Sequence, residues 1–343
     1  MMTQNNGTLY IHGAGHYHPE NVIDNAFLES LGIGTNDQWI MERVGIKKRH
    51  SVLDLRYIQN SQNQFLNDRV VNESSAEMGS KAIDMAVLRA GITKGDIGMV
   101  VAASCAPTYS LPANACVIAQ QAGINALGID ISSACSSFAA HIHFLSSMDA
   151  ATMPDYVVCV IPESWTTTTD FSDRRTAVLI GDGAAAVIVS KKHMADMKVK
   201  QTFMQSDPAS WEKVQTPTGG HFYQDGLSVQ KFAIKKTMAT FKHLQKTEDQ
   251  ALNQHYFISH QANLTMLKSV CKKLQIQPDK HLFNVDQFGN CGGAGAPSVL
   301  SQNWDNFKAG DLLTLIVVGA GLTWGGMVIE HINTNNMAGS NET

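Results

Sequence analysis

Unbroken apolar runs of strand length alternate with helix-like segments along the first half of the chain. The strand-like runs occupy residues 98–105, 127–134, 155–163 and 176–190. Helical periodicity marks residues 75–92 and 113–124, which lie between these runs. Because the strands show no alternation of polar positions, both of their faces are expected to be covered. The pattern predicts an α/β fold with a mostly parallel sheet between layers of helices.

The second half repeats this rhythm. Helices are expected at 232–246 and 264–276, a strand enters a polar loop within 255–263, and a glycine-rich loop opens a helix within 289–307. Residues 312–331 read as two strands around a glycine turn, as does TAVLIGDGAAAVIVS at 176–190. The repeated order of elements predicts an internal duplication.

The duplication suggests a division of the chain into two similar α/β halves, a connecting segment and a tail. The expected boundaries are 8–190 for the first half, 191–225 for the connection, 226–332 for the second half and 333–343 for a polar tail. The connection is the stretch most expected to be irregular. A second irregular insertion is expected at 52–74, where the chain is long and polar.

Composition narrows the possible functions. The chain has 343 residues, of which 44% are hydrophobic and 16% charged, with a net charge of −4. Dispersed basic residues do not form the clustered surface that nucleic acid requires. The first residues lack the features of a signal peptide, and no apolar run approaches the ~18 residues of a membrane span.

Six cysteines are present, at positions 105, 116, 135, 159, 271 and 291. Their spacing contains no CxxC pair and matches no zinc module, so no metal site is expected. The simplest interpretation is a cytoplasmic protein with reduced thiols, in which most cysteines are small buried hydrophobes.

Cys135 is the exception, because it joins the strand-like LGIDISSA to the helix-like SSFAAHIHFLSSMDAA. At the start of a helix, unpaired backbone N–H groups and the helix dipole stabilise a thiolate. Position alone leaves two interpretations open, a packing residue and a nucleophile.

Three further segments carry polar or glycine-rich loops after apolar runs. His260 follows a strand in FISHQAN, Asn290 lies in DQFGNCGGAGAP, and the chain closes with GAGLTWGG at 319–326. A thiolate can attack a thioester, and His and Asn side chains can then donate hydrogen bonds to an enolate oxygen. The four segments together therefore indicate covalent acyl chemistry.

This set resembles the thiolase-fold condensing enzymes, and most closely the β-ketoacyl-acyl carrier protein synthase III type. NDQWIMERVGIKKRH at 36–50 and the closing GAGLTWGG are similar to segments of that family. The resemblance extends over roughly residues 8–332. It implies a thiolase fold, in which two duplicated βαβαβαββ halves pack in a five-layer αβαβα arrangement.

The resemblance also implies a reaction. Cys135 is acylated by an acyl-CoA or acyl carrier protein thioester, with no other cofactor, and a malonyl- or β-ketoacyl-thioester then condenses with the acyl group. His260 and Asn290 stabilise the enolate. The backbone N–H groups of Cys135 and Ala320 form the oxyanion hole.

Further positions match the family's substrate tunnel and its dimer. The positions implied to bind coenzyme A are Trp39, Arg43, Arg174, Gly226 and Asn263. The family is usually a homodimer, and Leu111 is implied to reach the acyl pocket of the partner. An acyl carrier protein is a further expected partner.

The chain departs from the family pattern in three places, of which one is FYQDGLSVQKF, where Leu227 and Gln230 replace the expected polar and aromatic residues. Ser137 stands where the family commonly has glycine, and Gly292 and Gly293 replace larger residues, which predicts a wider pocket beside Asn290. We interpret the departures as a sign of an unusual acyl or carbanion donor, as in the specialised enzymes of secondary metabolism.

Those enzymes include ketosynthase-cyclases that join two β-ketoacyl units into a cyclohexanedione, a precursor of dialkylresorcinols or stilbenes. Glu163 is a candidate for the extra base that ring closure needs, and the alternative is a strand-end carboxylate held by backbone N–H groups. An acyltransferase to an oxygen or nitrogen nucleophile has less need of Asn290. A non-catalytic partner subunit has no need of Cys135 or His260.

Overall fold

The computed structural model describes residues 7–64 and 69–334. Most of the polar tail expected at 333–343 and part of the insertion expected at 52–74 therefore lie outside the described residues. Within the described ranges, no helix has both the length and the apolar character that crossing a bilayer requires.

The first half contains five strands of the main sheet and three long helices in βαβαβαββ order. In chain order these are β1 Tyr10–Tyr17, α4 Ser75–Ala90, β4 Ile97–Ala102, α5 Asn114–Ala122, β5 Leu127–Asp130, α6 Ser137–Ser147, β6 Tyr156–Glu163 and β7 Gly183–Ser190. The second half repeats the series as β8 Met197–Ser206, α8 Gly226–Gln245, β11 Tyr256–Ser259, α9 Leu264–Leu274, β12 His281–Leu282, α11 Gly295–Gln302, β13 Leu312–Gly319 and β14 Thr323–His331.

Shorter elements lie in the connections between these strands and helices. They are β2 Asn21–Asp24, α1 Asn25–Ser30, α2 Asp37–Arg43, β3 Lys48–Ser51, α3 Leu55–Ser61, α7 Arg174–Ala177, β9 Val214–Gln215, β10 Tyr223–Gln224 and α10 Val285–Phe288.

Strand order confirms the thiolase fold and its duplication. The main sheet runs β12-β11-β13-β14-β8-β1-β7-β6-β4-β5. Numbered within each half, both sets of five strands have the same order, third-second-fourth-fifth-first. The fifth strand of each half, β7 or β14, is antiparallel to both of its neighbours.

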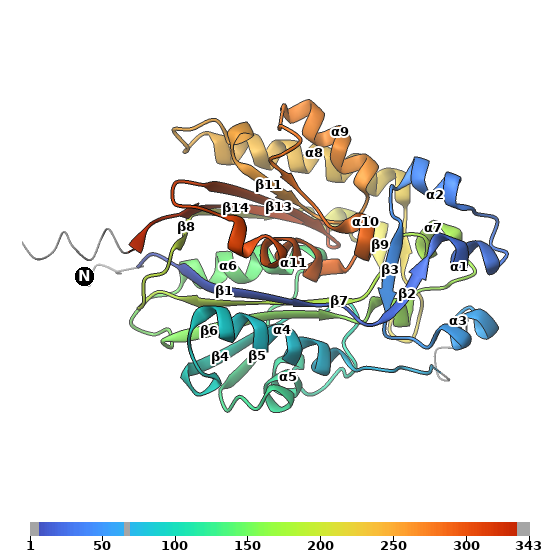
Figure 1. Ribbon diagram of the computed structural model, residues 1–343, viewed down its shortest axis with the longest axis horizontal. Helices are drawn as coiled ribbons and strands as arrows, with labels where there is room; N and C mark the ends of the chain where they lie inside the picture. The colour runs from blue at the N-terminus through green and yellow to red at the C-terminus, as the bar shows by residue number, and fades with distance from the viewer. Residues whose placement is uncertain (1–6, 65–68, 335–343) are drawn as a thin grey trace, which may run out of the picture.

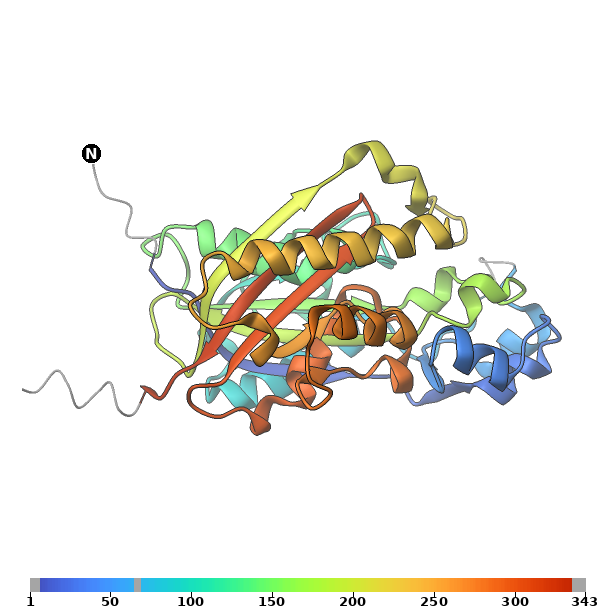
Figure 2. The ribbon, with the colours of Figure 1, turned by 90° about the horizontal axis from the view of Figure 1, so that it is seen from above.

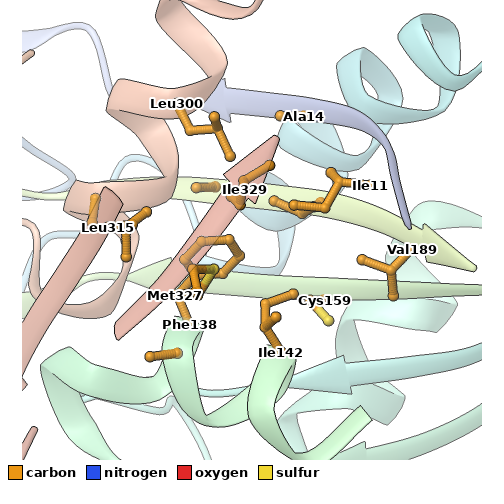
Figure 3. Close-up of a cluster of buried hydrophobic side chains, with 14 of the residues drawn as sticks. Ile11, Ala14, Phe138, Ile142, Cys159, Val189, Leu300, Leu315, Met327 and Ile329 are labelled. Atoms are coloured by element: carbon orange, nitrogen blue, oxygen red, sulfur yellow. The ribbon is translucent and has the colours of Figure 1, made fainter. Parts of the chain in front are cut away.

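The two halves of the sheet meet only where Tyr10 and Ile11 pair with Lys198 and Met197. From this contact they diverge and enclose α6 and α11, while α4 and α5 cover one outer face and α8 and α9 cover the other (Figure 1, Figure 2). Figure 3 shows side chains from α6, from α11 and from strands of both halves in one buried cluster.

Local sequence explains the ends of the outer helix α4. Ser74 and Glu77 form reciprocal hydrogen bonds with each other's backbone N–H, which is a capping box. At the other end Gly91 adopts a left-handed conformation with a φ of 65°. Alanines and other apolar residues on one face then pack against β1 and β7.

Four sequence-based expectations differ from the structure. The run 176–190 begins with the end of helix α7, so only β7 is a strand. The run 127–134 is a strand only as far as Asp130, and it is an exposed sheet edge rather than a buried strand, with Leu127 63% exposed. The stretches 191–225 and 52–74 are not irregular throughout, because they contain β8 and α3. The domain boundaries themselves stay a prediction.

Candidate active site

Cys135 lies in a tight turn between the loop after β5 and the first residue of α6. Ala134 has a φ of +48°, a left-handed conformation that is uncommon for a residue with a side chain. The turn places Cys135 at the start of the helix, where it is 6% exposed. The expected position at a helix N-terminus is therefore observed.

Hydroxyl groups hold this turn in place. The Oγ of Ser137 accepts a hydrogen bond from the Ser133 N–H at 2.9 Å and donates one to the Ala134 carbonyl at 2.6 Å. Ser136 Oγ lies 2.6 Å from Oγ1 of Thr323 on β14. Ser137, which departs from the family's glycine, thus stabilises the turn that carries Cys135.

His260 follows β11 in the second half. Its backbone N–H donates to the carbonyl of Ile316 on the adjacent strand β13 at 3.0 Å, which sets the direction in which the side chain leaves the sheet. Its side chain lines the same cavity as Cys135. Among the described residues, Nδ1 of His260 has no hydrogen-bond partner.

Asn290 is held by a short parallel bridge to the segment that precedes β7. Its N–H donates to the Leu179 carbonyl at 2.8 Å, and its own carbonyl accepts from the Gly181 N–H at 3.1 Å. The side-chain oxygen accepts from the Gly292 N–H at 3.1 Å. This bond orients the amide so that its NH₂ group remains as a donor for another partner.

The environment of Cys135 favours a thiolate. A hydrogen bond from the Cys105 thiol is the largest cause, and the adjacent His260 also contributes, so that the pKa of Cys135 falls to about 5 despite burial. The same contact, together with burial, raises the pKa of Cys105 well above its ordinary value. At neutral pH, Cys135 is therefore the ionised member of the pair.

One cavity of about 530 Å³ brings the predicted site residues together. Nine residues singled out from the sequence line it: Trp39, Arg43, Cys135, Arg174, Gly226, His260, Asn263, Asn290 and Ala320. They come from both halves of the chain and from the helices α2 and α7. The chemistry-bearing and the coenzyme-binding predictions thus fall in a single continuous space.

Basic side chains surround the aromatic ring at one end of this cavity. The guanidinium groups of Arg43 and Arg174 lie 4.9 and 4.8 Å from the ring centre of Trp39. Figure 1 shows α2 and α7, which carry these residues, at the same end of the molecule. Asn263 caps α9 and donates to the Arg43 carbonyl at 3.2 Å. The arrangement provides an aromatic surface and positive charge for an anionic ligand.

The closing glycine segment lies directly against the Cys135 turn. A Cβ atom on Gly319 would lie 2.8 Å from the Ser136 nitrogen and 3.0 Å from the Cys135 nitrogen. Only glycine fits there without movement of the turn. The absence of a side chain lets Ala320 line the cavity together with Cys135.

Two predicted residues lie away from this cavity. Leu111, in the loop between β4 and α5, is 85% exposed. Glu163, at the end of β6, is fully buried and lines neither this cavity nor the cavity of about 880 Å³ that reaches Cys105. Its Oε2 accepts from the Cys105 N–H at 2.7 Å, and its Oε1 accepts from the Gly293 N–H at 2.9 Å.

The prediction that Gly292 and Gly293 widen the pocket beside Asn290 is wrong. A Cβ atom on Gly292 would lie 2.6 Å from Glu163 Oε1, and one on Gly293 would lie 3.1 Å from the Ala134 carbonyl. Glu163 and the Cys135 turn therefore occupy the space that larger residues would need.

Sequence reasoning missed several residues of the site. Cys105 was grouped with the packing cysteines, although it comes shortly after β4, and the ends of parallel strands meet at one edge of a sheet. Arg175 also lines the cavity, and its place beside Arg174 was an available signal. Trp165 and Phe222, whose rings meet edge to face at 4.6 Å, pack in one apolar cluster with Cys135.

Possible metal ligands were sought among the residues that the structure describes. No group of three or more His, Cys, Asp or Glu side chains there could hold an ion.

Comparison with known proteins agrees with this geometry. The model of the family described as 3-oxoacyl-[acyl-carrier-protein (ACP)] synthase III matches residues 129–208, and the model of its C-terminal part matches residues 244–331. A β-ketoacyl-[acyl-carrier-protein] synthase III of Sulfurovum sp. is 31% identical over 330 residues, which cover 90% of this chain and 92% of the relative. One from Clostridioides difficile is 30% identical, with 93% and 97% covered.

A solved structure gives the same result. The 3-oxoacyl-[acyl-carrier-protein] synthase III of Aquifex aeolicus superposes with a TM-score of 0.84 at 27% identity, covering 94% of this chain and all of the other. The fold and the site define a thiolase-fold acyltransferase. The chain belongs to the β-ketoacyl-acyl carrier protein synthase III family.

Proposed function

We propose that Cys135 takes an acyl group from an acyl-CoA or acyl carrier protein thioester and that the acyl-enzyme then condenses with a malonyl- or β-ketoacyl-thioester. The observation that carries the proposal is the placement of Cys135, His260 and Asn290 on one cavity, with Cys135 as a thiolate. The relatives named above act, by their names, as β-ketoacyl-acyl carrier protein synthases.

The first half-reaction forms a thioester on Cys135. The thiolate attacks the thioester carbonyl, the bond to the carrier sulfur breaks, and the carrier leaves as a thiol after taking up a proton. The backbone N–H groups of Cys135 and Ala320 are the proposed donors to the oxyanion of this step.

The second half-reaction forms a carbon–carbon bond. With a malonyl thioester, loss of CO₂ leaves its electron pair as an enolate, whose oxygen accepts hydrogen bonds from His260 and from the amide of Asn290. The enolate carbon attacks the acyl carbonyl, and the bond to Cys135 breaks to return the thiolate. The side-chain oxygen of Asn290 accepts from the Gly292 N–H, so the side-chain NH₂ group is left to donate to the enolate. Transfer to an oxygen or nitrogen nucleophile forms no enolate, so this donor favours condensation.

The cyclising alternative needs a base in contact with the substrate. Glu163 is fully buried and lines neither cavity, and two backbone N–H groups hold its carboxyl group. The geometry therefore favours condensation without ring closure by Glu163.

Coenzyme A is the proposed ligand of the end of the 530 Å³ cavity where Trp39, Arg43 and Arg174 lie. The adenine would stack on Trp39, and the phosphates would lie near Arg43 and Arg174. Asn263 and Gly226 line the same cavity and would flank the pantetheine arm of coenzyme A. An acyl carrier protein, which the names of the relatives include, is the second proposed donor of thioesters.

A homodimer in the cytoplasm is also proposed. The sheet ends at β5, an edge strand on which Leu127 and Ile129 are exposed, and such an apolar edge is suited to pairing with a second chain. Leu111 would then enter the partner's acyl pocket. All six cysteines are unpaired, as a reducing compartment would leave them. Sedimentation analysis at micromolar concentration tests the dimer.

Intact-mass measurement after incubation with acyl-CoAs of graded chain length tests the proposed function. We expect one acyl adduct on the wild-type protein and none on Cys135→Ala, because no other cysteine lines the 530 Å³ cavity. Cys116→Ala, which removes an exposed thiol away from the cavity, is the matched control and should load normally. If no acyl-CoA or acyl carrier protein thioester forms an adduct, the proposal is wrong.

A further inference from the structure

A hydroxyl group on β14 joins the turn that carries Cys135 to the loop that carries Ala320. Oγ1 of Thr323, the first residue of β14, lies 2.6 Å from Ser136 Oγ and 3.1 Å from Ser133 Oγ. It also donates a hydrogen bond to the Ala320 carbonyl at 3.1 Å. Thr323 therefore contacts both of the backbone segments whose N–H groups are the proposed oxyanion donors.

The protons of these hydroxyl groups give the contacts a consistent direction. Each hydroxyl group has one proton to donate and can also accept. In one arrangement Ser133 donates to Ser136 at 2.9 Å, and Ser136 donates to Thr323. In the other, Ser136 donates to the Ser133 carbonyl at 2.7 Å, and Ser133 donates to Thr323. In both, the Cys135 turn donates to Thr323, and the proton of Thr323 remains for the Ala320 carbonyl.

Close backbone packing brings the two proposed oxyanion donors near each other. A Cβ atom on Gly319 would lie only 3.0 Å from the Cys135 nitrogen, and the Ala320 N–H belongs to the peptide group that follows Gly319. Cys135 and Ala320 both line the cavity of about 530 Å³. A misplacement of about 1 Å in a catalytic arrangement can cost about 10²-fold in rate. The spacing between the two segments that Thr323 joins is therefore important for the proposed reaction.

The Ala320 loop is held on its other side by backbone pairing. The Asp207 N–H donates to the Leu322 carbonyl at 2.7 Å, and the Leu322 N–H donates to the Asp207 carbonyl at 3.1 Å. These two bonds attach the loop to the segment after β8 and do not reach the Cys135 turn. Thr323 supplies the side-chain link between the loop and that turn.

We propose that Thr323 is a positioning residue, whose hydroxyl group sets the two backbone N–H groups of the oxyanion hole by bonding to the Cys135 turn and to the Ala320 loop. The inference rests on the proposed function, because the oxyanion forms only when Cys135 attacks a thioester. Thr323 does not line the cavity, so it acts through the backbone and not on the substrate.

Two reactions of the same thiol separate this role from a general structural one. Attack on an acyl-CoA passes through an oxyanion, whereas alkylation by iodoacetamide displaces iodide and forms none. Thr323→Val nearly keeps the shape of the side chain and removes the hydroxyl group. We expect the maximal rate of acyl loading to fall about 10-fold, with alkylation of Cys135 and the half-saturating acyl-CoA concentration within about 2-fold of the wild type. Thr323→Ser retains the hydroxyl group and should recover most of the loading rate.

The acyl-CoA used is the one of the graded series that loads the wild type fastest, and intact mass measures both reactions. Thr314→Val is the matched control, because Thr314 is a buried threonine of the adjacent strand β13 whose Oγ1 lies 3.0 Å from His255 Nδ1. Neither Thr314 nor His255 lines the cavity, so this variant should load at the wild-type rate. If far-UV circular dichroism shows that Thr323→Val does not fold, Ser136→Ala removes the neighbouring hydroxyl group and should slow loading without slowing alkylation.

The outcomes separate the inference from the proposed function. Loading of Thr323→Val at the wild-type rate overturns the inference and leaves the proposed function intact. Equal slowing of loading and alkylation also overturns the inference, because the hydroxyl group would then act on the thiol and not on the oxyanion. A wild-type Cys135 that is alkylated but accepts no acyl group from any thioester contradicts the proposed function, and the inference with it.

Discussion

Each half contains a tight turn that leads from a strand region into a central helix, and the two turns differ in the side chains that they carry. In the first half, Ala134 has a φ of +48° immediately before Cys135 and α6. In the second half, Gly292 has a φ of +53° immediately before Gly293 and α11. Both turns therefore have a left-handed residue at the same place before the helix, while the next residue carries a thiol in one turn and no side chain in the other.

The difference shows how a duplicated fold acquires a single active site. The second turn cannot carry side chains at 292–293, because Glu163 of the first half and the Cys135 turn already fill that space. What remains in the second half is the segment before the turn, where Asn290 faces the cavity. In the proposed reaction, one half would supply the nucleophile and the other the donors to the enolate.

Removal of the donor from the second half should have the largest effect. Asn290→Ala should load acyl groups on Cys135 normally but condense them about 10²–10³-fold more slowly, because one enolate donor is lost. Mass measurement of loading and a radiochemical assay of condensation separate the two steps. Condensation at the wild-type rate would show that Asn290 plays no part in the chemistry.

Exchange of the two turn residues tests the backbone comparison directly. Gly292→Ala should lower the free energy of unfolding by about 3 kcal/mol, because it combines a left-handed conformation with a clash against Glu163. Ala134→Gly, the matched change in the first half, should leave stability unchanged or raise it by about 1 kcal/mol. Urea unfolding of both variants measures this, and equal losses would mean that the turns are not equivalent.

Buried carboxyl groups make the junction between the halves sensitive to pH. Burial raises the pKa of Glu163 to about 8 and that of Asp182 to about 7, above their values in an unfolded chain. The folded state thus holds more protons, and its stability is lost as pH rises through 7 to 8. We expect the free energy of unfolding to fall by about 3–4 kcal/mol between pH 6 and pH 8.

Urea unfolding at the two pH values checks this dependence, and Glu163→Gln should remove about half of it, because Asp182 still titrates. Stability that is constant or rises from pH 6 to pH 8 would show that both carboxyl groups are already ionised in the folded state.

The hydroxyl that braces the first turn should have the smallest effect. Ser137→Gly restores the residue common in the family but removes bonds to the Ser133 N–H and the Ala134 carbonyl. The expected loss is about 1 kcal/mol of stability with slower loading of Cys135. The matched control Ser147→Gly also removes a serine from α6, at its exposed end, and a similar loss of loading there would assign the effect to the helix rather than to the turn.

Much of the fold was predictable because unalternated apolar runs, helix periodicity and a repeated order of elements are local signals. The helix at 75–92 appears as α4, and the closing pair of strands appears as β13 and β14. The strand expected at 127–134 was too long, because Ser132 and Ser133 read as strand residues but turn toward Cys135. The strand β8 was missed within 191–225, because it is partly exposed and therefore contains polar residues.

The candidate site was predictable where one residue type has a specific chemistry, as with Cys135, His260 and Asn290. Cys105 was not, because an apolar cysteine after a strand has the same sequence pattern whether it packs far from Cys135 or against the same cluster. Gly292 and Gly293 were misinterpreted for a related reason. A missing side chain indicates free space only when no distant residue fills it.

The sequence by itself determined the duplicated α/β architecture and the family, and it singled out the residues proposed for acyl chemistry, because periodicity and residue type are local properties of the chain. Only the tertiary structure decided that nine of the predicted residues share one cavity. It also decided that Glu163 lies outside that cavity and that Cys105 packs against the apolar cluster that contains Cys135. Those facts depend on contacts between residues far apart in the chain, where side-chain volume and hydrogen bonding across the two halves fix each position.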